Sequence, residues 1–426
     1  MKTHEQFRPT SLEWLEVLPS DWDEREIGRE VWVRARLGWK GLTASEYVDN
    51  GVPMLATPDI KGRAIDYGGA NRIPQDRYDE SPEIMLREGD VLLTKDGSTI
   101  GTVNVVRDLP EPATVNGSIA VLTPTGRLDG RYLYWFIAST YAQGTFDRLR
   151  GGMGVPHLFQ RDINRIRLPF PRPLEQRAIA DFLDRETTQI DTLIEEQQRL
   201  IELLRERRSA SIARSTGWDH STADWTRARL SWLFDRTASG TTPANADIVY
   251  SSEAEIPWVT TGELREEVII ETQRGVTADV VGRYSGLSVH PSGSLLIAMY
   301  GATIGRTALL GIDAASNQAC CALVGPIGVD VEFVQYSLSA ARERLLLEAV
   351  GGGQPNINQE KIRSFRIPVP SLIEQRRIVA DLKEKTEKID SLIAKAEQFI
   401  ELSRERRAAL ITAAVTGQID VRDEVA

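Results

Sequence analysis

Two stretches of the chain have apolar residues at regular three- and four-residue steps, with charged residues between them. The apolar positions of the two stretches are Ile179, Leu183, Ile190, Leu193, Leu200 and Leu204, and then Ile378, Leu382, Ile389, Leu392 and Phe399. This spacing draws one apolar stripe along a helix. Prolines before each stretch impose an extended lead-in, and Gly217 or Gly417 follows as a helix stop. We therefore predict a long helix in residues 169–217 and another in residues 368–417.

The two helical stretches are copies of one another. Residues 168–179 return 199 residues later as residues 367–378, both copies contain Glu-Gln-Arg, and both end in Thr-Gly. The regions between them are related more weakly, as in the glycine-bounded segments 89–101 and 293–305. The chain is therefore duplicated, in the order variable domain, helix, variable domain, helix. An isolated long helix with a single apolar stripe is unstable in water. We therefore expect the two helices to form an antiparallel coiled coil with approximate two-fold symmetry.

The variable domains have the pattern of α+β domains. Short apolar runs bounded by glycine or polar residues predict strands at residues 91–94, 119–123, 295–298 and 319–324. Helices are expected at residues 131–146 and 332–349. We assign residues 1–168 to the first globular domain, 218–367 to the second, and 418–426 to a tail.

Composition places the chain among ordinary globular proteins but gives it an acidic balance. Hydrophobic residues make up 41% and charged residues 26%, with a formal net charge of -10. No apolar run reaches the roughly 18 residues of a membrane span. The N-terminus lacks the apolar core of a secretory signal, so we expect a cytoplasmic protein. The two adjacent cysteines, Cys320 and Cys321, are expected to be small buried hydrophobes in a reducing compartment.

The sequence offers no self-contained active site. It has no Gly-x-x-x-x-Gly-Lys-Ser/Thr phosphate loop, no Asn/Asp-Pro-Pro-Tyr/Phe methyltransferase motif, and no dinucleotide-binding glycine fingerprint. Its four histidines, at positions 4, 157, 220 and 290, have no ligand spacing, so we predict no zinc site. Pro58-Asp59 has no partner for nuclease chemistry. We expect a chain without catalytic residues, metal or cofactor of its own.

Two glycine-bounded loops at corresponding places are the best candidates for nucleic-acid contact. Glycine lets backbone N–H groups approach a phosphate closely, and a Ser or Thr hydroxyl adds a hydrogen bond. A tight turn between two strands is the alternative interpretation of both loops. Side-chain amides near Gln160 and in residues 354–359 suit the edge of adenine. The candidates are Lys95, Gly97, Ser98, Thr99, Gln160, Tyr300, Gly301, Thr303, Arg306, Asn356 and Asn358.

The helices carry a family resemblance. Residues 171–179 and 370–378 resemble the Pro-Leu-x-Glu-Gln motif that begins the long helices of Type I restriction-modification specificity subunits, and residues 406–421 resemble their helix ends. The Gly-x-Thr-Ile-Gly pattern at 97–101 and 301–305, together with Asn317-Gln318, resembles weaker motifs of their target-recognition domains. The first domain departs from the last motif, because it has Asn116-Gly117.

The resemblance implies a non-catalytic subunit that binds double-stranded DNA at a bipartite site, one half per domain. The helices then act as a ruler and as the dock for two modification subunits, which bind S-adenosylmethionine and methylate adenine. Restriction subunits that use ATP and Mg²⁺ join them. The candidate docking residues are Glu175, Gln176, Arg177, Glu374, Gln375 and Arg376. Since the two variable domains differ in sequence, we expect two unlike half-sites.

The acidic balance keeps other functions open. A free DNA-binding protein usually has a basic surface, so phosphate contacts here must be locally clustered or supplied by partners. A scaffold that joins two interaction domains without binding DNA would explain the charge. The Arg-rich segments 205–208 and 404–407 fit either phosphate contact or a solvated helix face. A detached recognition region of a single-chain enzyme and an independent methyltransferase are further alternatives.

Overall fold

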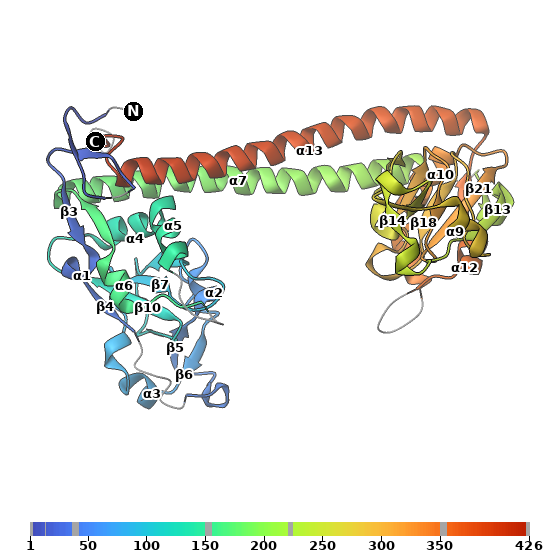
Figure 1. Cartoon of the computed structure of the whole chain (residues 1–426). Coiled ribbons are helices and arrows are strands. Elements are labelled where there is room, and N and C mark those ends of the chain that lie inside the picture. Colours follow the sequence, from blue (N-terminus) through green and yellow to red (C-terminus); the bar gives the residue numbers. More distant parts are fainter. Residues whose placement is uncertain are drawn as a thin grey trace. The chain divides into compact units, whose positions relative to one another are not determined.

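The computed structural model describes residues 3–12, 14–35, 42–149, 156–219, 225–349 and 356–422. The chain forms two compact units, one of Met1–Gln197 with Gln398–Ala426 and the other of Gln198–Glu397. Each unit contains part of both long helices, α7 (Pro173–Ser215) and α13 (Leu372–Val415). In Figure 1 the first unit runs from blue to green and includes the red end of the chain, and the second unit runs from yellow-green to orange.

The first unit is built around an antiparallel sheet in the order β4-β10-β7-β8, accompanied by a smaller sheet in the order β6-β5-β9. Its strands are β1 (Phe7–Pro9), β2 (Val17–Pro19), β3 (Asp23–Glu26), β4 (Val31–Arg34), β5 (Val52–Leu55), β6 (Asn71–Ile73), β7 (Val91–Thr94), β8 (Val103–Val105), β9 (Thr114–Val115), β10 (Ile119–Pro124) and β11 (Arg167–Phe170). Its shorter helices are α1 (Ile27–Glu30), α2 (Thr57–Ile60), α3 (Gln75–Asp79), α4 (Gly130–Ala138), α5 (Thr140–Leu149) and α6 (Gln160–Arg165).

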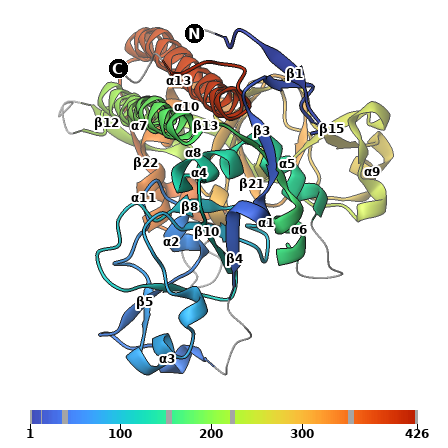
Figure 2. The same cartoon turned by 90° about the vertical axis from the view of Figure 1, so that its left-hand side faces the viewer.

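The central strands of this sheet are apolar on both faces because both faces are covered. Along β7, Val91 and Leu93 join one core with the α4 residue Phe136, whereas Leu92 joins a second core on the other face. This alternation follows from the two-residue period of a strand. Figure 2 shows α4 and α5 over the sheet that contains β4 and β10. The predicted strands 91–94 and 119–123 are confirmed.

The second unit repeats this plan with a five-stranded sheet in the order β13-β21-β18-β19-β16 and a four-stranded sheet in the order β14-β17-β15-β20. Its strands are β12 (Thr226–Arg229), β13 (Phe234–Ser239), β14 (Val249–Tyr250), β15 (Ile256–Val259), β16 (Val268–Ile269), β17 (Arg274–Val276), β18 (Leu295–Ala298), β19 (Thr307–Leu310), β20 (Ala315–Ser316), β21 (Cys320–Pro326) and β22 (Arg366–Val369). Its shorter helices are α8 (Leu230–Leu233), α9 (Ala278–Arg283), α10 (Val331–Ala340), α11 (Arg342–Leu347) and α12 (Gln359–Ser364).

The adjacent cysteines lie on β21 and face opposite cores of the second unit. Cys320 packs with Leu296, and Cys321 packs with Leu295 and Ile297. Both thiols are free and fully buried, and burial raises the pKa of each to about 12. The prediction of small buried hydrophobes is confirmed.

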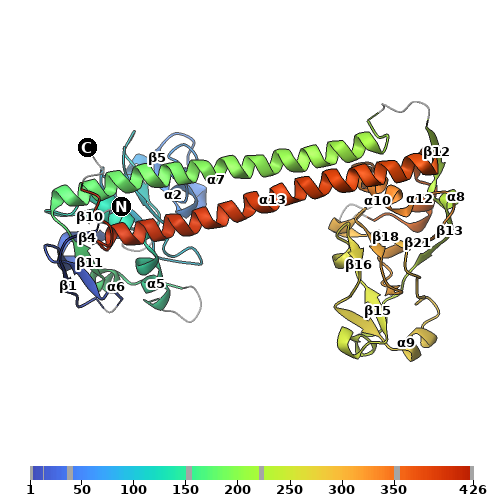
Figure 3. The same ribbon diagram turned by 90° about the horizontal axis from the view of Figure 1, so that it is seen from above.

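Within each unit, the segments of α7 and α13 lie side by side and run in opposite directions (Figures 1 and 3). In the second unit, Arg205 contacts Glu397 at 3.2 Å and Arg208 contacts Asp390 at 3.1 Å, so residue numbers rise along one helix as they fall along the other. In the first unit, Ile179 and Leu183 share a core with Leu410 and Ile411. The predicted antiparallel pairing is confirmed in each unit. No helix in the described ranges is long and apolar enough to cross a membrane.

Two helices predicted as continuous are each broken into two. Residues 131–146 fall in α4 and α5, and residues 332–349 in α10 and α11. At the first break, Ser139 leaves the helical region with φ -66° and ψ 151°. Its hydroxyl donates to the Phe136 carbonyl at 2.6 Å and accepts from the Ala142 N–H at 3.3 Å. Ser139 therefore ends α4 and caps α5, as short hydroxyl side chains do at helix ends.

Candidate nucleic-acid interface

The first glycine-bounded loop connects β7 to β8. Gly97 and Gly101 have φ of 86° and 95°, which residues with a side chain rarely adopt. A side chain at Gly101 would also lie 2.4 Å from Oε1 of Gln143, whose Nε2 donates to the Gly101 carbonyl at 2.9 Å. The side chain of Gln143 on α5 thus fixes the conformation of the loop through this hydrogen bond.

The second loop connects β18 to β19 and has the same construction. Gly301 and Gly305 have φ of 64° and 75°. Here the residue that holds the loop is Arg342 of α11, whose guanidinium donates to the carbonyls of Ile304 at 3.0 Å and Ala302 at 3.1 Å. Both loops are therefore tight connections between strands, as the alternative interpretation predicted, and phosphate contact through them stays a prediction.

Each loop pairs with the segment that precedes a short helix much later in the chain. Asp96 forms a β-bridge with His157, and Tyr300 forms one with Asn356. The Gly97 N–H donates to the Pro156 carbonyl at 3.0 Å. These bridges bring the predicted loop residues of each unit next to the predicted amide segment. The glycines at 151–154 and residues 351–355, including Gln354, lie outside the described residues.

In the first unit, the loop surface is polar and carries opposite charges. The Asp96 carboxylate lies between Lys95, whose Nζ is 2.7 Å away, and the ring of His157, which contacts it directly. Ser98 and Thr99 are exposed at the loop tip, and their hydroxyls have no side-chain partner among the described residues. The loop and the segment bridged to it therefore carry exposed hydroxyls, a histidine and a lysine paired with Asp96.

In the second unit, the corresponding surface is aromatic and amide-bearing. Tyr300 is about half exposed, and both Arg306 and Asn356 are partly exposed. The Thr303 hydroxyl donates to the Tyr300 carbonyl at 2.9 Å and so supports the turn. The two loop surfaces thus share a backbone and differ in the side chains that they present.

Two predicted amide candidates have structural roles. Nε2 of Gln160 donates to the Val33 carbonyl of β4, and Nε2 of Gln359 donates in the same way to the Thr237 carbonyl of β13 at 2.9 Å. Oδ1 of Asn358 accepts from the Lys361 N–H at 2.9 Å and caps α12. Reading adenine requires both the donor and the acceptor of an amide. These bonds therefore leave Asn356 as the amide candidate best placed for base contact.

Two predicted docking residues are buried and form a hydrogen-bonded latch. Oε1 of Gln176 accepts from the Asp129 N–H at 2.8 Å, and its Nε2 donates to the Pro171 carbonyl at 2.9 Å. Gln375 makes the same two bonds, with Asp330 and Pro370, both at 2.8 Å. Both glutamines have an exposed fraction of 0%. Direct contact of either amide with a partner would therefore require these hydrogen bonds to open, and docking through Gln176 and Gln375 stays a prediction.

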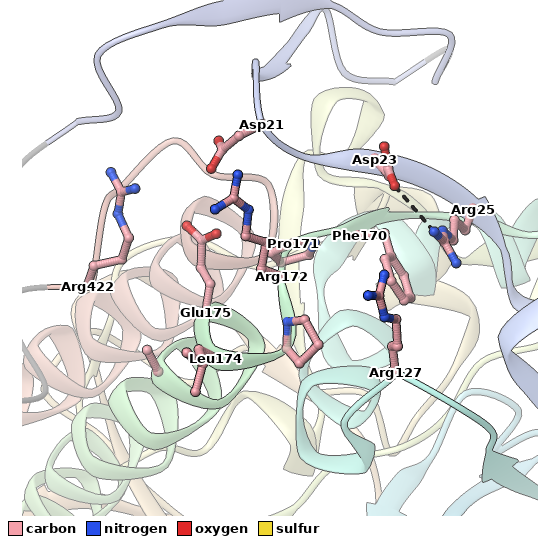
Figure 4. Close-up of a pocket in the computed structure, with 12 residues that line it drawn as sticks. Asp21, Asp23, Arg25, Arg127, Phe170, Pro171, Arg172, Leu174, Glu175 and Arg422 are labelled. Carbon is pink, nitrogen blue, oxygen red and sulfur yellow. Dashed lines mark hydrogen bonds and ion pairs between the residues drawn. The ribbon is translucent and has the colours of Figure 1, made fainter.

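The matched glutamates have different surroundings. Glu175 is buried, and burial raises its pKa, whereas Glu374 is about one-third exposed and its pKa is lowered by a bond from Arg377 at 2.6 Å. Figure 4 shows the Glu175 carboxylate between the side chains of Arg422 and Arg172 in a cavity of about 770 Å³. Of the docking candidates, Arg177 and Arg376 are exposed at matched positions.

Two exposed apolar residues beside these arginines were not predicted from the sequence. Leu174 is 80% exposed and Ile373 is 84% exposed, and they occupy matched positions in the first turns of α7 and α13. The available signal was their position off the apolar stripe, five residues before Ile179 and Ile378. A single exposed apolar side chain is common on protein surfaces, and the notable feature here is that one recurs at the same position in both repeats.

A family model matches the chain twice, over residues 19–204 and 223–402, and its description is Type I restriction modification DNA specificity domain. The two matches cover most of the chain. The chain belongs to the family of Type I specificity subunits. The family predicted from the helix motifs is therefore confirmed.

Relatives in this family differ in how much of their length is matched. The Type I restriction enzyme MjaVIII specificity subunit of Methanocaldococcus jannaschii is 25% identical over 42% of this chain and 41% of its own length. The EcoR124I/EcoR124II specificity subunit of Escherichia coli is 26% identical over 36% of this chain and 38% of its own length. The chain thus spans about two fifths of these relatives. The putative MjaX specificity subunit of M. jannaschii is 23% identical over 95% of both chains.

Solved structures share the fold. A chain from work on complex assembly and conformational transition of the type I R-M system aligns with a TM-score of 0.72, at 17% identity over 94% of this chain and 99% of its own length. The HsdS subunit of Thermoanaerobacter tengcongensis aligns with a TM-score of 0.55, at 16% identity over 94% of this chain and 98% of its own length. At these identities the likeness shows the fold alone.

Proposed function

We propose that this chain is the DNA-reading subunit of a Type I restriction-modification complex and has no catalytic role of its own. Each compact unit binds one half of a bipartite site in double-stranded DNA. Modification subunits that carry S-adenosylmethionine then methylate adenine, and restriction subunits that use ATP and Mg²⁺ complete the complex. The observation that carries this proposal is the repeated loop and bridge, with one backbone plan in both units and different side chains on it.

The chemistry of the two surfaces suits different sequences. A turn held by glycine supplies backbone N–H groups for phosphate, while side chains beside it reach base edges. In the first unit these side chains are Ser98, Thr99 and His157, and in the second they are Tyr300 and Asn356. An asparagine amide pairs with adenine in the major groove, whereas hydroxyls accept several partners. We therefore expect unlike half-sites.

The test is a genome-wide map of adenine methylation in cells that express this chain with its modification subunit. We expect a split motif with unlike halves that disappears when only this chain is omitted. Two matched variants sharpen the experiment. His157→Ala should relax or abolish recognition of one half, and Asn356→Ala should do so for the other half, because each bridge belongs to one unit. If both variants changed the same half, the assignment of one half-site to each unit would be wrong.

We further propose that modification subunits dock on the matched pairs Leu174 with Arg177 and Ile373 with Arg376. The duplication gives two equal surfaces, each an exposed apolar side chain with a cation three residues later on the same helix face. Two equal surfaces suit two copies of one partner whose contact segment is apolar and acidic.

Co-purification measures this docking. Leu174→Asp and Ile373→Asp should each reduce the number of bound modification subunits from two to one, and the double variant should bind none. Leu347→Asp is the control, because Leu347 is 86% exposed and belongs to α11 rather than to α7 or α13. Retention of two bound subunits by the double variant would exclude these surfaces.

A non-DNA-binding scaffold is the second candidate, and the net charge of -10 favours it. A scaffold would form a stable complex with partner proteins and leave adenine methylation unchanged when removed. Assembly without methylation that depends on this chain would therefore favour the scaffold over the proposed reader.

A further inference from the structure

Three side chains from distant parts of the sequence meet at the start of α7. His4 comes from the N-terminal segment, Glu175 from the first turn of α7, and Asp420 from the segment after α13, all within the first unit. The potential ligand atoms of the three residues lie within 4.8 Å of one another. His4 is 6% exposed and Glu175 is 7% exposed, so this is not a solvated acidic surface.

The histidine at this place lacks a hydrogen bond. Nε2 of His4 lies 3.8 Å from Oε1 of Glu175, which is too far for a hydrogen bond, and the ring has no other polar partner among the described residues. Its remaining contacts are edge-on with the rings of Trp22 and Phe7. A buried polar group without a partner costs free energy, so such a group calls for a ligand.

Although the sequence alone predicted no metal site, we propose that His4, Glu175 and Asp420 bind one divalent transition-metal ion of the zinc and cobalt class. One imidazole nitrogen and two carboxylates form a ligand set that these ions accept. Ligand bonds of about 2.0–2.2 Å in a tetrahedral arrangement place neighbouring ligand atoms roughly 3.4 Å apart. The His4–Glu175 separation of 3.8 Å is close to this value, and a small inward movement of Asp420 completes the site.

Arg422 competes with this ion. Its Nε and Nη2 donate to the two carboxylate oxygens of Asp420 at 2.8 and 2.5 Å. Oδ1 also accepts from the Arg422 backbone N–H at 3.1 Å, so the lone pair that remains for an ion is on Oδ2. The nearby positive charge of Arg422 weakens ion binding there. The cavity that Glu175 and Arg422 line provides access from solvent (Figure 4).

The bound ion would tie the N-terminal segment and the C-terminal segment to the first turn of α7. The second unit has no equivalent among its described residues, because Glu374 is partly exposed and paired with Arg377. Glu374→Gln therefore serves as a matched control that removes a glutamate from the same place in the other repeat. The proposal is independent of DNA reading, and so is its measurement.

The experiment uses the full chain without a histidine tag, freed of metal by a chelator and then titrated with Co²⁺. Visible absorption and melting temperature are recorded together, and Zn²⁺ is added to displace Co²⁺. We expect one equivalent of Co²⁺ with a tetrahedral-type spectrum and a rise in melting temperature, both retained in Glu374→Gln.

The variants separate binding from folding. His4→Gln and Asp420→Asn should each weaken Co²⁺ binding at least tenfold while keeping the far-ultraviolet circular dichroism of the parent. Arg422→Gln should strengthen binding, because the competing charge is gone, and a folding defect cannot produce that gain. Absence of Co²⁺ binding by the parent chain, or equal binding by His4→Gln, would overturn the proposal.

Discussion

One buried amide in each long helix fixes the geometry between the helix and its sheet domain. Each glutamine side chain bonds a carbonyl just before its long helix and a backbone N–H of the sheet domain. Gln176 bonds the N–H of Asp129, which precedes α4, and Gln375 bonds the N–H of Asp330, which precedes α10. Asp129 and Asp330 in turn cap α4 and α10 with their carboxylates. The recognition domain and the helix are thus connected at the same point in both repeats.

Replacing this amide by an apolar side chain of similar size tests the connection. Gln176→Leu leaves the Asp129 N–H and the Pro171 carbonyl without partners, each costing about 1–3 kcal/mol. We expect the free energy of unfolding to fall by roughly 2–4 kcal/mol in urea denaturation. Arg177→Ala, at an exposed neighbour, should change it by less than about 0.5 kcal/mol. Equal effects of the two substitutions would contradict the latch.

His290 gives the second unit a dependence of stability on pH. It is fully buried, and burial, with a smaller effect from Arg236, lowers its pKa from 6.5 to about 4. The folded state therefore disfavours protonation of His290. The free energy of unfolding keeps its full contribution from neutral His290 above pH 6.5 and falls as the pH drops toward 4. The loss at pH 5 should be about 2 kcal/mol, measured by urea denaturation at pH 7 and 5.

The other repeat supplies the control for His290. The matched residue of the first unit is Leu86. Its N–H donates to the Ala113 carbonyl, just as the His290 N–H donates to the Ala314 carbonyl. His290→Leu should fold and should lose this part of the pH dependence. An unchanged difference between pH 7 and pH 5 would show that other groups cause it.

At the scale of elements, the matched leucines of the two long helices test the pairing within each unit. Leu183 and Leu382 are both fully buried, the first in a core with Leu410 and the second in a core with Ile212 and Phe333. Leu183→Ala and Leu382→Ala should each lower the free energy of unfolding by about 2–5 kcal/mol in thermal or urea denaturation. Leu392→Ala is the control, because Leu392 is half exposed, and a comparable loss there would be unexpected.

Several elements were predictable from sequence because they depend on local pattern. Glycine-bounded apolar runs gave the strands β7 and β18 with correct bounds, since both are buried on both faces. The helix breaks at Ser139 and Ala341 were not predicted, because periodicity continues across them and the break depends on local capping. Long-range contacts were also missed: the Asp96–His157 bridge depends on how β7 meets a segment 61 residues away.

The candidate site was predictable in part for the same reason. The glycines of both loops were identified, since a positive φ requires that residue type. The structural roles of Gln160 and Asn358 were not, because a side-chain amide in a polar loop has the same sequence signal whether it bonds the protein or a ligand. The burial of Gln176 was not predicted, because its charged neighbours Glu175 and Arg177 indicate an exposed segment.

At the scale of the whole molecule, the net charge of -10 predicts weak DNA binding by the isolated chain. When few phosphates are contacted, affinity depends only weakly on salt. The logarithm of the binding constant falls against the logarithm of the salt concentration with a slope of about -0.9 for each phosphate neutralised. We expect anisotropy titrations to give a dissociation constant of roughly 10⁻⁶ M or weaker at physiological salt. Modification subunits should tighten binding to the motif at least a hundredfold and steepen the slope. Tight, motif-specific binding by the chain alone would show that its own surface suffices.

The buried cysteines of β21 make this protein well suited to chemical labelling. A thiol reacts with a maleimide as its thiolate, and thiols with a pKa of about 12 in a closed core hold almost none at neutral pH. The sequence has no other cysteine. A fluorophore or spin label can therefore be attached at one introduced surface cysteine without first removing the native pair. Spectroscopy on loop tips such as Ser98 then starts from an unmodified core.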